Sequence, residues 1–264
     1  MQAELNFVVN RGEPLVVYPS VGGGQAEWKS GDYEDRSVTI EDGRLAAEPF
    51  DLDVHGFLLW EQRSQVSDFY DDEQLHVTYE REMESLVKDL TGAQEVVVFD
   101  HTRRSDDPQV REQRRIREPA ATAHNDYTEA SGPRRIRDLL SPTDAERWLR
   151  GRFAIINVWR PIVGPLARSP LVLCDARTVE PGDLVVTQRR AKERIGEIYQ
   201  LAFNPAQRWV YFPAMERHEV LVFKCFDSAP AGRARFAPHT AFAGPAGDAP
   251  PRQSIETRTI ARFS

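Results

Sequence analysis

The sequence of 264 residues predicts a mainly β domain, a sandwich or a barrel, with helices packed against its outside. The first supporting observation is a change of character at Gly151. After this residue, short runs rich in β-branched and aromatic residues alternate with turn residues such as Pro181-Gly182. The second is that no sequence repeat of fixed period occurs. The third is a hydrophobic content of 41%, which is enough for one substantial core in a chain of this length.

The predicted β region contains several short strands. They span residues 153–159, 171–174, 184–187, 198–203, 209–212, 220–226, 235–236 and 254–260. No Gly/Ser-rich linker divides the middle of the chain, so we expect a single domain over residues 1–264. Within it, we expect about residues 1–120 to form a mixed α/β flank and about residues 121–264 to form the β core with the iron site.

The segment before Gly151 predicts two helices. Apolar residues at three- and four-residue steps predict a helix over residues 67–90, followed by a β-branched strand at 95–99. Residues 100–119 are highly charged and are expected to form a loop. The motif Ser141-Pro142-Thr143-Asp144 predicts the start of a second helix, because serine caps a helix well and proline suits its first position.

The charge balance and the cysteines limit the class of protein. The chain has 41 acidic and 34 basic residues, which argues against non-specific nucleic-acid binding, since that depends on neutralising phosphates. Cys174 and Cys225 each lie in an apolar run and are expected to be buried thiols, as in a reducing cytoplasm. No apolar stretch approaches the ~20 residues that span a bilayer. We therefore expect a cytoplasmic protein that binds neither nucleic acid nor membrane.

The strongest chemical signal is the motif His124-Asn125-Asp126. Of the six histidines, only His124 stands in a His-x-Asp pattern. Residues two apart on a strand point to the same side, so this imidazole and this carboxylate can hold one metal ion. A second histidine from a distant strand would complete a two-His-one-carboxylate site with open positions, which is typical of non-haem iron(II) oxygenases.

The second histidine is predicted to be His239. Arg252 and Ser254 follow it after 13 and 15 residues, and a guanidinium fork with a nearby hydroxyl suits the distal carboxylate of a 2-oxo diacid such as 2-oxoglutarate. His218 is the competing candidate, but it stands among charged residues with no Arg-x-Ser at a suitable distance after it. Another Arg-x-Ser, Arg103-Arg104-Ser105, precedes the metal ligands and cannot take the same part, although a substrate contact is its alternative role. The arginine runs at 103–104 and 111–117 are expected to be solvated loops, with a binding role as the less favoured alternative.

Seven segments carry a resemblance that extends from about Phe69 to the end of the chain. They are ATAHNDY (121–127), INVWRP (156–161), SPLVLCDA (169–176), NPAQRWVYFPAM (204–215), KCFDS (224–228), PHTAF (238–242) and PRQSIETR (251–258). Together they resemble the CmcJ/NvfI-type family of iron(II)/2-oxoglutarate-dependent oxygenases. The resemblance implies a double-stranded β-helix (jelly-roll, cupin-like) core and a small-molecule substrate in secondary metabolism. It also implies iron at His124, Asp126 and His239, and 2-oxoglutarate at Arg252 and Ser254.

Further residues are candidates for the substrate or for support of the metal ligands. The Gly/Pro-rich segment 244–251 lengthens the gap between His239 and Arg252, so Arg258, on the same face by alternation, is the alternative anchor for 2-oxoglutarate. Asn157 and Arg160 lie on the strand that the resemblance puts near the active site. Tyr127 and Tyr199 could donate hydrogen bonds into the site, although a tyrosine on a barrel strand is more often part of the core.

The predicted reaction is hydroxylation, desaturation or cyclisation of a small molecule, with O2 and 2-oxoglutarate as co-substrates. No separate acid or base is assigned, because the iron centre carries the chemistry. One rival hypothesis is an iron oxidase of the same fold that uses no 2-oxoglutarate. The other is a non-catalytic accessory or binding protein. A homodimer or a partner enzyme of the same pathway is possible under each hypothesis.

Overall fold

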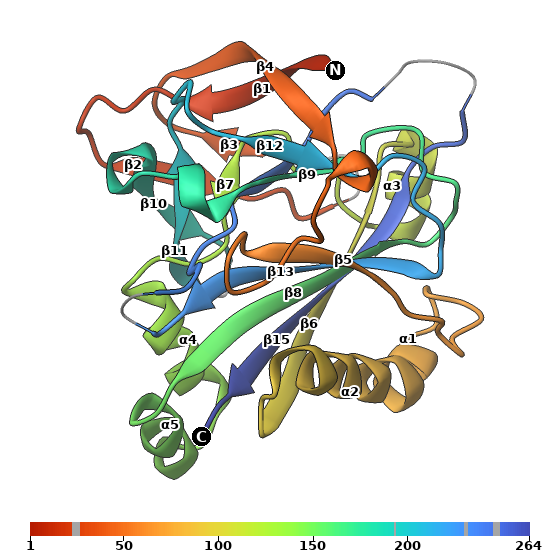
Figure 1. The fold of residues 1–264 in the computed structure, drawn as a ribbon, viewed down its shortest axis with the longest axis vertical. Helices are drawn as coiled ribbons and strands as arrows, with labels where there is room; N and C mark the ends of the chain where they lie inside the picture. The colour runs from red at the N-terminus through yellow and green to blue at the C-terminus, as the bar shows by residue number, and fades with distance from the viewer. Residues whose placement is uncertain (23–26, 193, 230–231, 245–248) are drawn as a thin grey trace.

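The computed structural model describes residues 1–22, 27–192, 194–229, 232–244 and 249–264, and two β-sheets form its centre (Figure 1). Five strands form one sheet in the order β5-β13-β8-β15-β6. Ten strands form the other in the order β1-β4-β12-β9-β14-β7-β11-β10-β2-β3. The strands are β1 (Gln2–Val8), β2 (Leu15–Tyr18), β3 (Trp28–Lys29), β4 (Tyr33–Asp42), β5 (Phe57–Glu61), β6 (Glu95–Ser105), β7 (His124–Asn125), β8 (Phe153–Pro161), β9 (Leu171–Cys174), β10 (Leu184–Arg190), β11 (Ile195–Leu201), β12 (Trp209–Tyr211), β13 (Glu219–Asp227), β14 (His239–Ala241) and β15 (Gln253–Arg262).

Helices cover the outside of these sheets. They are α1 (Asp72–Gln74), a π-helical turn (Leu75–Tyr79), α2 (Glu80–Thr91), α3 (Pro108–Arg114), α4 (Ser131–Leu139) and α5 (Pro142–Leu149). Three 3-10 turns accompany them at Gly43–Leu45, Ala176–Thr178 and Pro181–Asp183. In Figure 1, α1 and α2 lie below the five-stranded sheet, and α4 and α5 lie near one end of it.

The five-stranded sheet is buried on both faces. Every residue of β8 and β13 is buried, which is why both strands are rich in apolar residues that do not alternate regularly with polar ones. On the outer face, Tyr79 and Met83 from the helical segment pack in one cluster with Ile156 and Val158 of β8. The inner face of the five-stranded sheet is thus the face that packs against the ten-stranded sheet.

The two sheets enclose a common core. Trp159 and Phe223 from the five-stranded sheet belong to the same buried cluster as Leu173 and Val210 from the ten-stranded sheet. The strands β6, β15, β8 and β13 thus oppose β7, β14, β9 and β12 in a curled double sheet. The predicted fold class is confirmed: the protein is mainly β, with flanking helices and a double-stranded β-helix core.

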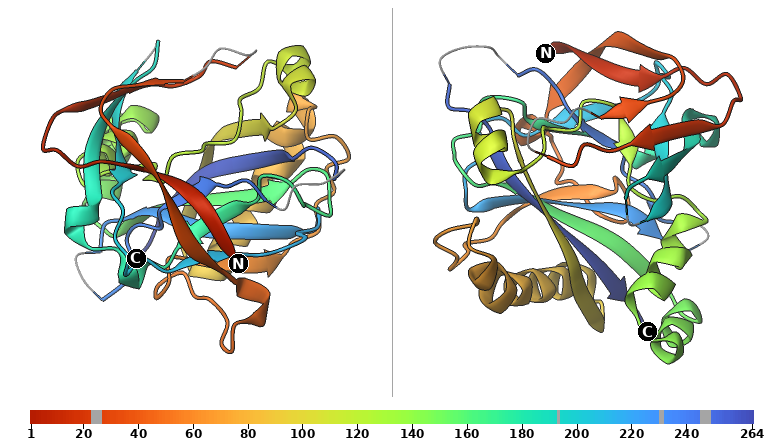
Figure 2. Two further views of the ribbon diagram at one scale, coloured as in Figure 1. Left: turned by 90° about the horizontal axis from the view of Figure 1, so that it is seen from above. Right: turned by 180° about the vertical axis from the view of Figure 1, so that it is seen from behind.

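The N-terminal residues extend the ten-stranded sheet at both of its edges. β1 and β4 join at β12, whereas β2 and β3 join at β10. Two further views show these strands on the side of the molecule opposite α2 (Figure 2). Two strands before residue 120 belong to the other sheet, because β5 pairs with β13, and β6 pairs with β15 along its whole length. The segments before and after residue 120 thus both contribute strands to each of the two sheets.

Several predicted elements are confirmed. The helix expected at 67–90 is the run from α1 to α2, which begins after the N-cap Asp71 and ends at Gly92 in the left-handed conformation (φ 71°). The helix expected at Ser141 is α5, and the serine side chain accepts from Asp144 N–H as an N-cap should. Most of the predicted strands correspond to β8 to β13 and β15.

Three expectations about local structure were wrong. Residues 100–119 are not a loop, because β6 continues to Ser105 and α3 follows it. The polar side chains of this segment hid a strand whose pairing with β15 only the tertiary fold supplies. α4 was not expected at all, since Ile136 and Leu139 are its only large apolar residues and are too few to mark a helical period. No strand forms at 235–236, where Arg235 instead pairs with Glu129.

Cys174 and Cys225 are free, buried thiols, as predicted. Burial raises the pKa of both thiols, so they stay protonated. Among the helices that the described residues form, none is both long enough and apolar enough to cross a membrane.

Candidate metal centre

Two neighbouring strands of the ten-stranded sheet bring the candidate ligands together. β7 pairs with β14 so that His124 lies opposite His239, and Asp126 follows directly after β7. One ligand atom from each of these three residues lies within 4.8 Å of the other two. The nearest approach between His124 Nε2 and Asp126 Oδ1 is 3.7 Å. The structure thus places all three sequence-predicted ligands around one point.

Backbone carbonyls orient both imidazoles. His124 Nδ1 lies 2.8 Å from the carbonyl oxygen of Thr122, and His239 Nδ1 lies 3.1 Å from that of Ala237. Each Nδ1 therefore carries the proton and donates it, which leaves Nε2 as the unprotonated nitrogen that faces Asp126. This second hydrogen bond is the usual way in which a protein fixes the tautomer of a metal-binding histidine.

The electrostatic surroundings keep these groups in the state that binds a cation. Burial and the neighbouring His239 lower the pKa of His124 to about 4, and burial also lowers the pKa of His239. Burial alone would raise the pKa of Asp126, but Arg258 and the two histidines outweigh it and hold this pKa far below its usual range. At neutral pH the site therefore offers two neutral imidazoles and one carboxylate.

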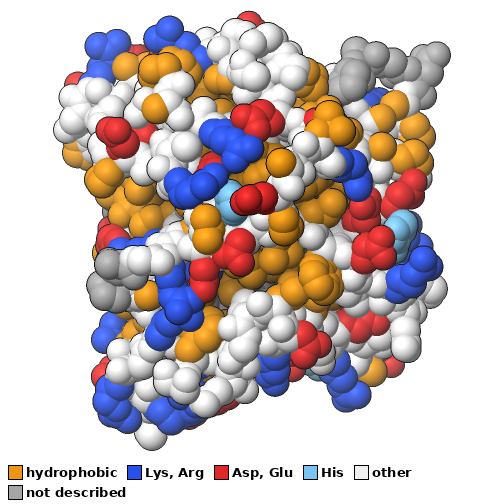
Figure 3. Space-filling model, viewed as in Figure 1, with side chains coloured by type: hydrophobic (Ala, Val, Ile, Leu, Met, Phe, Trp, Pro, Cys, Tyr) orange, Lys and Arg blue, Asp and Glu red, His pale blue; other side chains and the backbone are white. Residues whose placement is uncertain are grey.

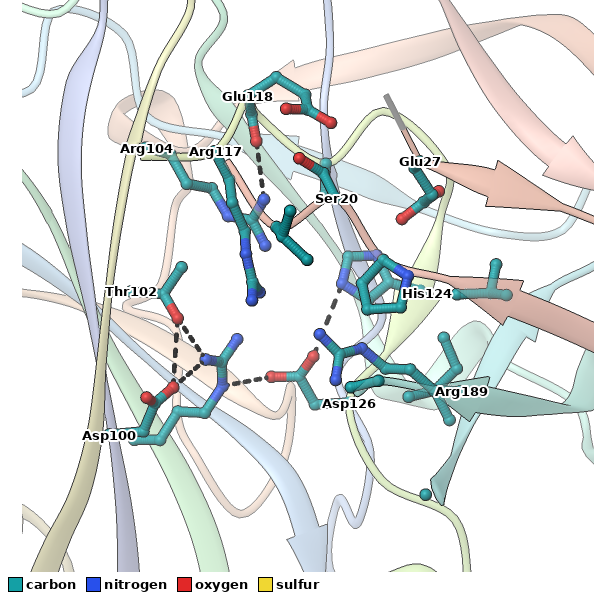
Figure 4. Close-up of a pocket in the computed structure, with 18 of the residues that line it drawn as sticks. Ser20, Glu27, Asp100, Thr102, Arg104, Arg117, Glu118, His124, Asp126 and Arg189 are labelled. Carbon is teal, nitrogen blue, oxygen red and sulfur yellow. Dashed lines mark hydrogen bonds and ion pairs between the residues drawn. The ribbon is translucent and has the colours of Figure 1, made fainter. Parts of the chain in front are cut away.

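Two donors hold the Asp126 carboxylate through a single oxygen. Asn157 Nδ2 and Arg258 Nε each donate to Oδ2, both at 3.0 Å. They come from adjacent strands, since Asn157 of β8 is the register partner of Arg258 of β15. Oδ1 remains directed toward His124 (Figure 4). This donor set, two nitrogens and one free carboxylate oxygen, fits iron(II) with open coordination positions.

A cavity of about 760 Å³ opens beside the three ligands. His124, Asp126, Tyr127 and Arg258 line it, and its volume is within the range for small-molecule sites. Burial raises the pKa of Tyr127 to about 12, so its hydroxyl stays protonated and can only donate or accept a hydrogen bond. The metal point is thus reachable from a space that can hold a substrate.

Arg252 and Ser254 form a separate, deeper cationic position at the start of β15. Arg252 Nε donates to Ser254 Oγ at 3.0 Å, and Nη1 donates to the carbonyl of Ser169 at 2.7 Å. The guanidinium stacks over Trp159, 5.0 Å from its ring centroid. Its Nη2 donates to no other residue in the described ranges, and burial lowers the pKa of Arg252 to about 9. A buried cation with an unused donor fits a carboxylate ligand.

Comparisons with known proteins agree with this geometry. A family model described as "Oxidoreductase/YMDC permease-like domain" matches residues 5–262. The Fe(II)/2-oxoglutarate-dependent dioxygenase nvfI of Aspergillus novofumigatus is 34% identical over 92% of this chain and 88% of its own length. The hydroxylase/desaturase efuI of Hormonema carpetanum is 31% identical over 86% and 84%. A solved structure titled iron and alpha-ketoglutarate-dependent endoperoxidase NvfI superposes with a TM-score of 0.87 at 30% identity, covering 100% of this chain and 98% of the other.

The chain belongs to the CmcJ/NvfI-type oxygenase family. The resemblance predicted from the sequence segments is therefore confirmed. The name of the nvfI dioxygenase mentions iron(II) and 2-oxoglutarate. The two imidazoles and the carboxylate of Asp126 are a ligand set that suits iron(II).

The structure of this oxygenase gives Arg258 a different position from the predicted one. Arg258 was the alternative anchor for 2-oxoglutarate. Its guanidinium is instead occupied by Asp126, Asp100, Thr102 and Glu256. Asn157, predicted to contact the substrate or co-substrate, contacts the metal carboxylate. Both residues orient Asp126, and the sequence could not reveal this because the contact depends on the register between β8 and β15.

Three other candidates lie away from the cavity. Arg160 is on the outer face of β8, where it donates to the carbonyl of Arg217 and to Gln62 and stacks over Tyr79. The Tyr199 hydroxyl accepts from the backbone of Glu129, and its ring packs on Phe236. His218 lies at the entry to β13, outside the group of potential metal ligands in the described residues.

Three further arginines line the cavity: Arg104 of β6, Arg117 after α3 and Arg189 of β10. The sequence favoured exposed loops over a binding role for the arginine-rich runs that contain the first two, and it gave no signal for Arg189. The first two lie in the segment that was expected to be a loop. Their only sequence signal was the local density of arginine, which more often marks an exposed surface.

Replacing Asn157 with leucine is expected to weaken iron(II) binding about 10- to 100-fold, the usual effect of losing a partner of a metal ligand. The substitution removes one of the two donors to Asp126 and leaves the carboxylate free to turn. An anaerobic iron(II) titration measures the change. Val158→Leu on the outward face of the same strand is the matched control, and equal weakening by both variants would contradict a specific role for Asn157.

Proposed function

We propose that this protein is an oxygenase that binds iron(II) through His124, Asp126 and His239 and 2-oxoglutarate through Arg252 and Ser254. It oxidises a small molecule by hydroxylation, desaturation or cyclisation, in secondary metabolism. The observation that carries the proposal is the group of three free ligand atoms within 4.8 Å, beside a substrate-sized cavity. The membership of the family supports the same activity.

The chemistry that bound iron(II) and 2-oxoglutarate supply is the reduction of O2, coupled to decarboxylation of 2-oxoglutarate to succinate and CO2 and to oxidation of the substrate. For hydroxylation, one oxygen atom of O2 enters succinate and the other enters the product. The protein contributes binding, orientation and protection of the site.

The residues of this chain divide these tasks. The Thr122 and Ala237 carbonyls hold the imidazoles in the tautomer that binds metal. Asn157 and Arg258 fix the direction of the Asp126 carboxylate, and Arg258 keeps it ionised. Arg252 and Ser254 offer charged and neutral donors to the distal carboxylate of 2-oxoglutarate. No separate acid or base is required by this arrangement.

Succinate formation tests the proposal against its two rivals. Under air, with iron(II) and 2-oxoglutarate present, we expect the protein to release one succinate for each 2-oxoglutarate consumed, measured by chromatography. Product formation from a substrate without succinate would support an oxidase that takes all electrons from its substrate. A protein that fails to bind iron(II) under anaerobic conditions would instead be a non-catalytic binding protein.

Four predictions from the sequence stay predictions: the single domain with its division near residue 120, the cytoplasmic location, the absence of nucleic-acid or membrane binding, and the homodimer or partner enzyme.

A further inference from the structure

The cavity beside the metal point has an excess of positive charge. Ten of the described residues that line it are Lys or Arg, whereas five are acidic: Glu27, Asp100, Glu118, Asp126 and Glu197. The whole chain has the opposite balance, with 34 basic and 41 acidic residues. On the face shown in Figure 3, basic and acidic side chains lie interspersed. The positive charge is thus concentrated where a substrate would bind.

Three of these arginines form a group around the cavity, which we call the arginine cluster: Arg104, Arg117 and Arg189. Arg104 and Arg117 come from paired segments on one side, and Arg189 comes from β10 on the other (Figure 4). Arg104 Nη1 donates to the carbonyl of Glu118 at 2.7 Å. The guanidinium groups of Arg117 and Arg189 form no hydrogen bond or ion pair with any other residue that the structure describes.

The three side chains raise one another's electrostatic free energy. Burial and the proximity of Arg117 and Arg258 lower the pKa of Arg189 to about 10. Burial also lowers the pKa of Arg104, and Arg258 and Arg117 add to this effect while Glu256 opposes it. Desolvated like charges without a counterion are costly, and an anion placed among them removes that cost.

The acidic groups of the cavity do not serve as that anion. Asp100 and Asp126 are already paired with Arg258. Glu197 accepts a hydrogen bond from Thr128, at 3.3 Å. Among the described residues, Glu27 and Glu118 form no ion pair with the arginine cluster, although both reach the cavity. The cluster is therefore prepared for a charge that the ligand brings.

The bound 2-oxoglutarate is not expected to supply this charge. Arg252 and Ser254, its proposed anchors, do not line the cavity and stand six and four residues before Arg258 on β15. One of its carboxylates would reach them, and the other would bind the metal. An anion at the arginine cluster is then a second one, on the cavity side of the metal point.

We propose that the arginine cluster binds a carboxylate of the substrate, so that this oxygenase acts on an acidic small molecule. This inference rests on the proposed function, because it takes the cavity to be the substrate site of an iron(II)/2-oxoglutarate enzyme. Guanidinium forks match carboxylates in pairs of hydrogen bonds, and three of them from two sides fix both the position and the direction of the acid. The acid group thereby turns the remainder of the molecule toward the metal point.

Matched acids and esters test the proposal directly. The protein is loaded with nickel(II), which does not react with O2 here, and with saturating 2-oxoglutarate. It is then titrated calorimetrically with cinnamate and with methyl cinnamate. We expect the acid to bind at least about tenfold more tightly than the ester. Added NaCl is expected to weaken binding of the acid and not of the ester, because salt screens the charge interaction.

Neighbouring residues of β10 provide the variant and its control. Arg189→Gln is expected to remove most of the preference for the acid. Arg190→Gln removes the same charge from an exposed side chain of the same strand, which bonds Gln188 and lies outside the cavity, and it should retain the preference. Equal binding of acid and ester to the unaltered protein, no binding of either, or equal losses in both variants would overturn the proposal.

A further measurement separates this inference from the function on which it rests. The 2-oxoglutarate affinity of each variant is determined with iron(II) under anaerobic conditions, from the weak visible charge-transfer band. If Arg189→Gln and Arg117→Gln weaken 2-oxoglutarate binding as much as Arg252→Gln does, the cluster serves the co-substrate. The inference then fails, although the proposed function stands. If 2-oxoglutarate produces no band in the unaltered protein, the proposed function itself fails.

Discussion

Replacing Asp126 with alanine is expected to abolish iron(II) binding and, with it, the turnover of 2-oxoglutarate. The variant removes the only anionic member of the three candidate ligands and leaves two neutral imidazoles. It also leaves the Arg258 guanidinium facing the metal point without the carboxylate that balances it there. We expect a loss in iron affinity well beyond the 10- to 100-fold that follows from disturbing a partner of a ligand.

Anaerobic iron(II) titration and succinate release measure this effect, and Asp100→Asn is its matched control. Asp100 also pairs with Arg258 and lines the same cavity, but it is not one of the three ligands. The control is expected to keep iron binding within about tenfold of the unaltered protein. Circular dichroism should show both variants folded, since Asp100 or Asp126 and Glu256 continue to pair with Arg258. Iron binding by Asp126→Ala at unaltered affinity would exclude the triad.

The metal triad was predictable because its signals are local. The alternation of side chains along a strand put His124 and Asp126 on one side, and the distance to Arg252 selected His239 over His218. β7 is only two residues long, yet the motif needs no more than that. The structure adds the pairing of His124 with His239, which the sequence could only assume.

The surroundings of the triad were not predictable in the same way. Asn157 and Arg258 converge on Asp126 through the register of two strands that lie about 100 residues apart in the sequence. Arg104 and Arg189 come from different sheets and meet only across the cavity. Such contacts depend on strand pairing, and a run of arginines carries the same signal whether it lines a cavity or faces water. The N-terminal strands were unplaced for the same reason, because they join the sheet through the pairing of β2 with β10 and of β4 with β12, both far along the chain.

The second large effect is expected at Arg252. Arg252→Gln should weaken 2-oxoglutarate binding about 100-fold or more, since truncating one partner of a buried, hydrogen-bonded charge pair costs about 2–5 kcal/mol. Ser254→Ala should weaken it less, because it removes a neutral hydroxyl, worth about 1.5–3 kcal/mol when it bonds a charged group. The 2-oxoglutarate dissociation constant at saturating iron(II) measures both effects.

Arg258 distinguishes this expectation from its alternative. Its guanidinium already bonds Asp126, Asp100 and Glu256, so a second carboxylate would have to displace one of them. Arg258→Gln is therefore expected to weaken iron(II) binding first, and to leave the 2-oxoglutarate affinity of the iron-saturated protein nearer the unaltered value than Arg252→Gln does. The reverse order at saturating iron would identify Arg258 as the anchor. In that case Arg252 would be a structural residue that stabilises the start of β15 through the hydrogen bonds of its Nε to Ser254 and of its Nη1 to Ser169.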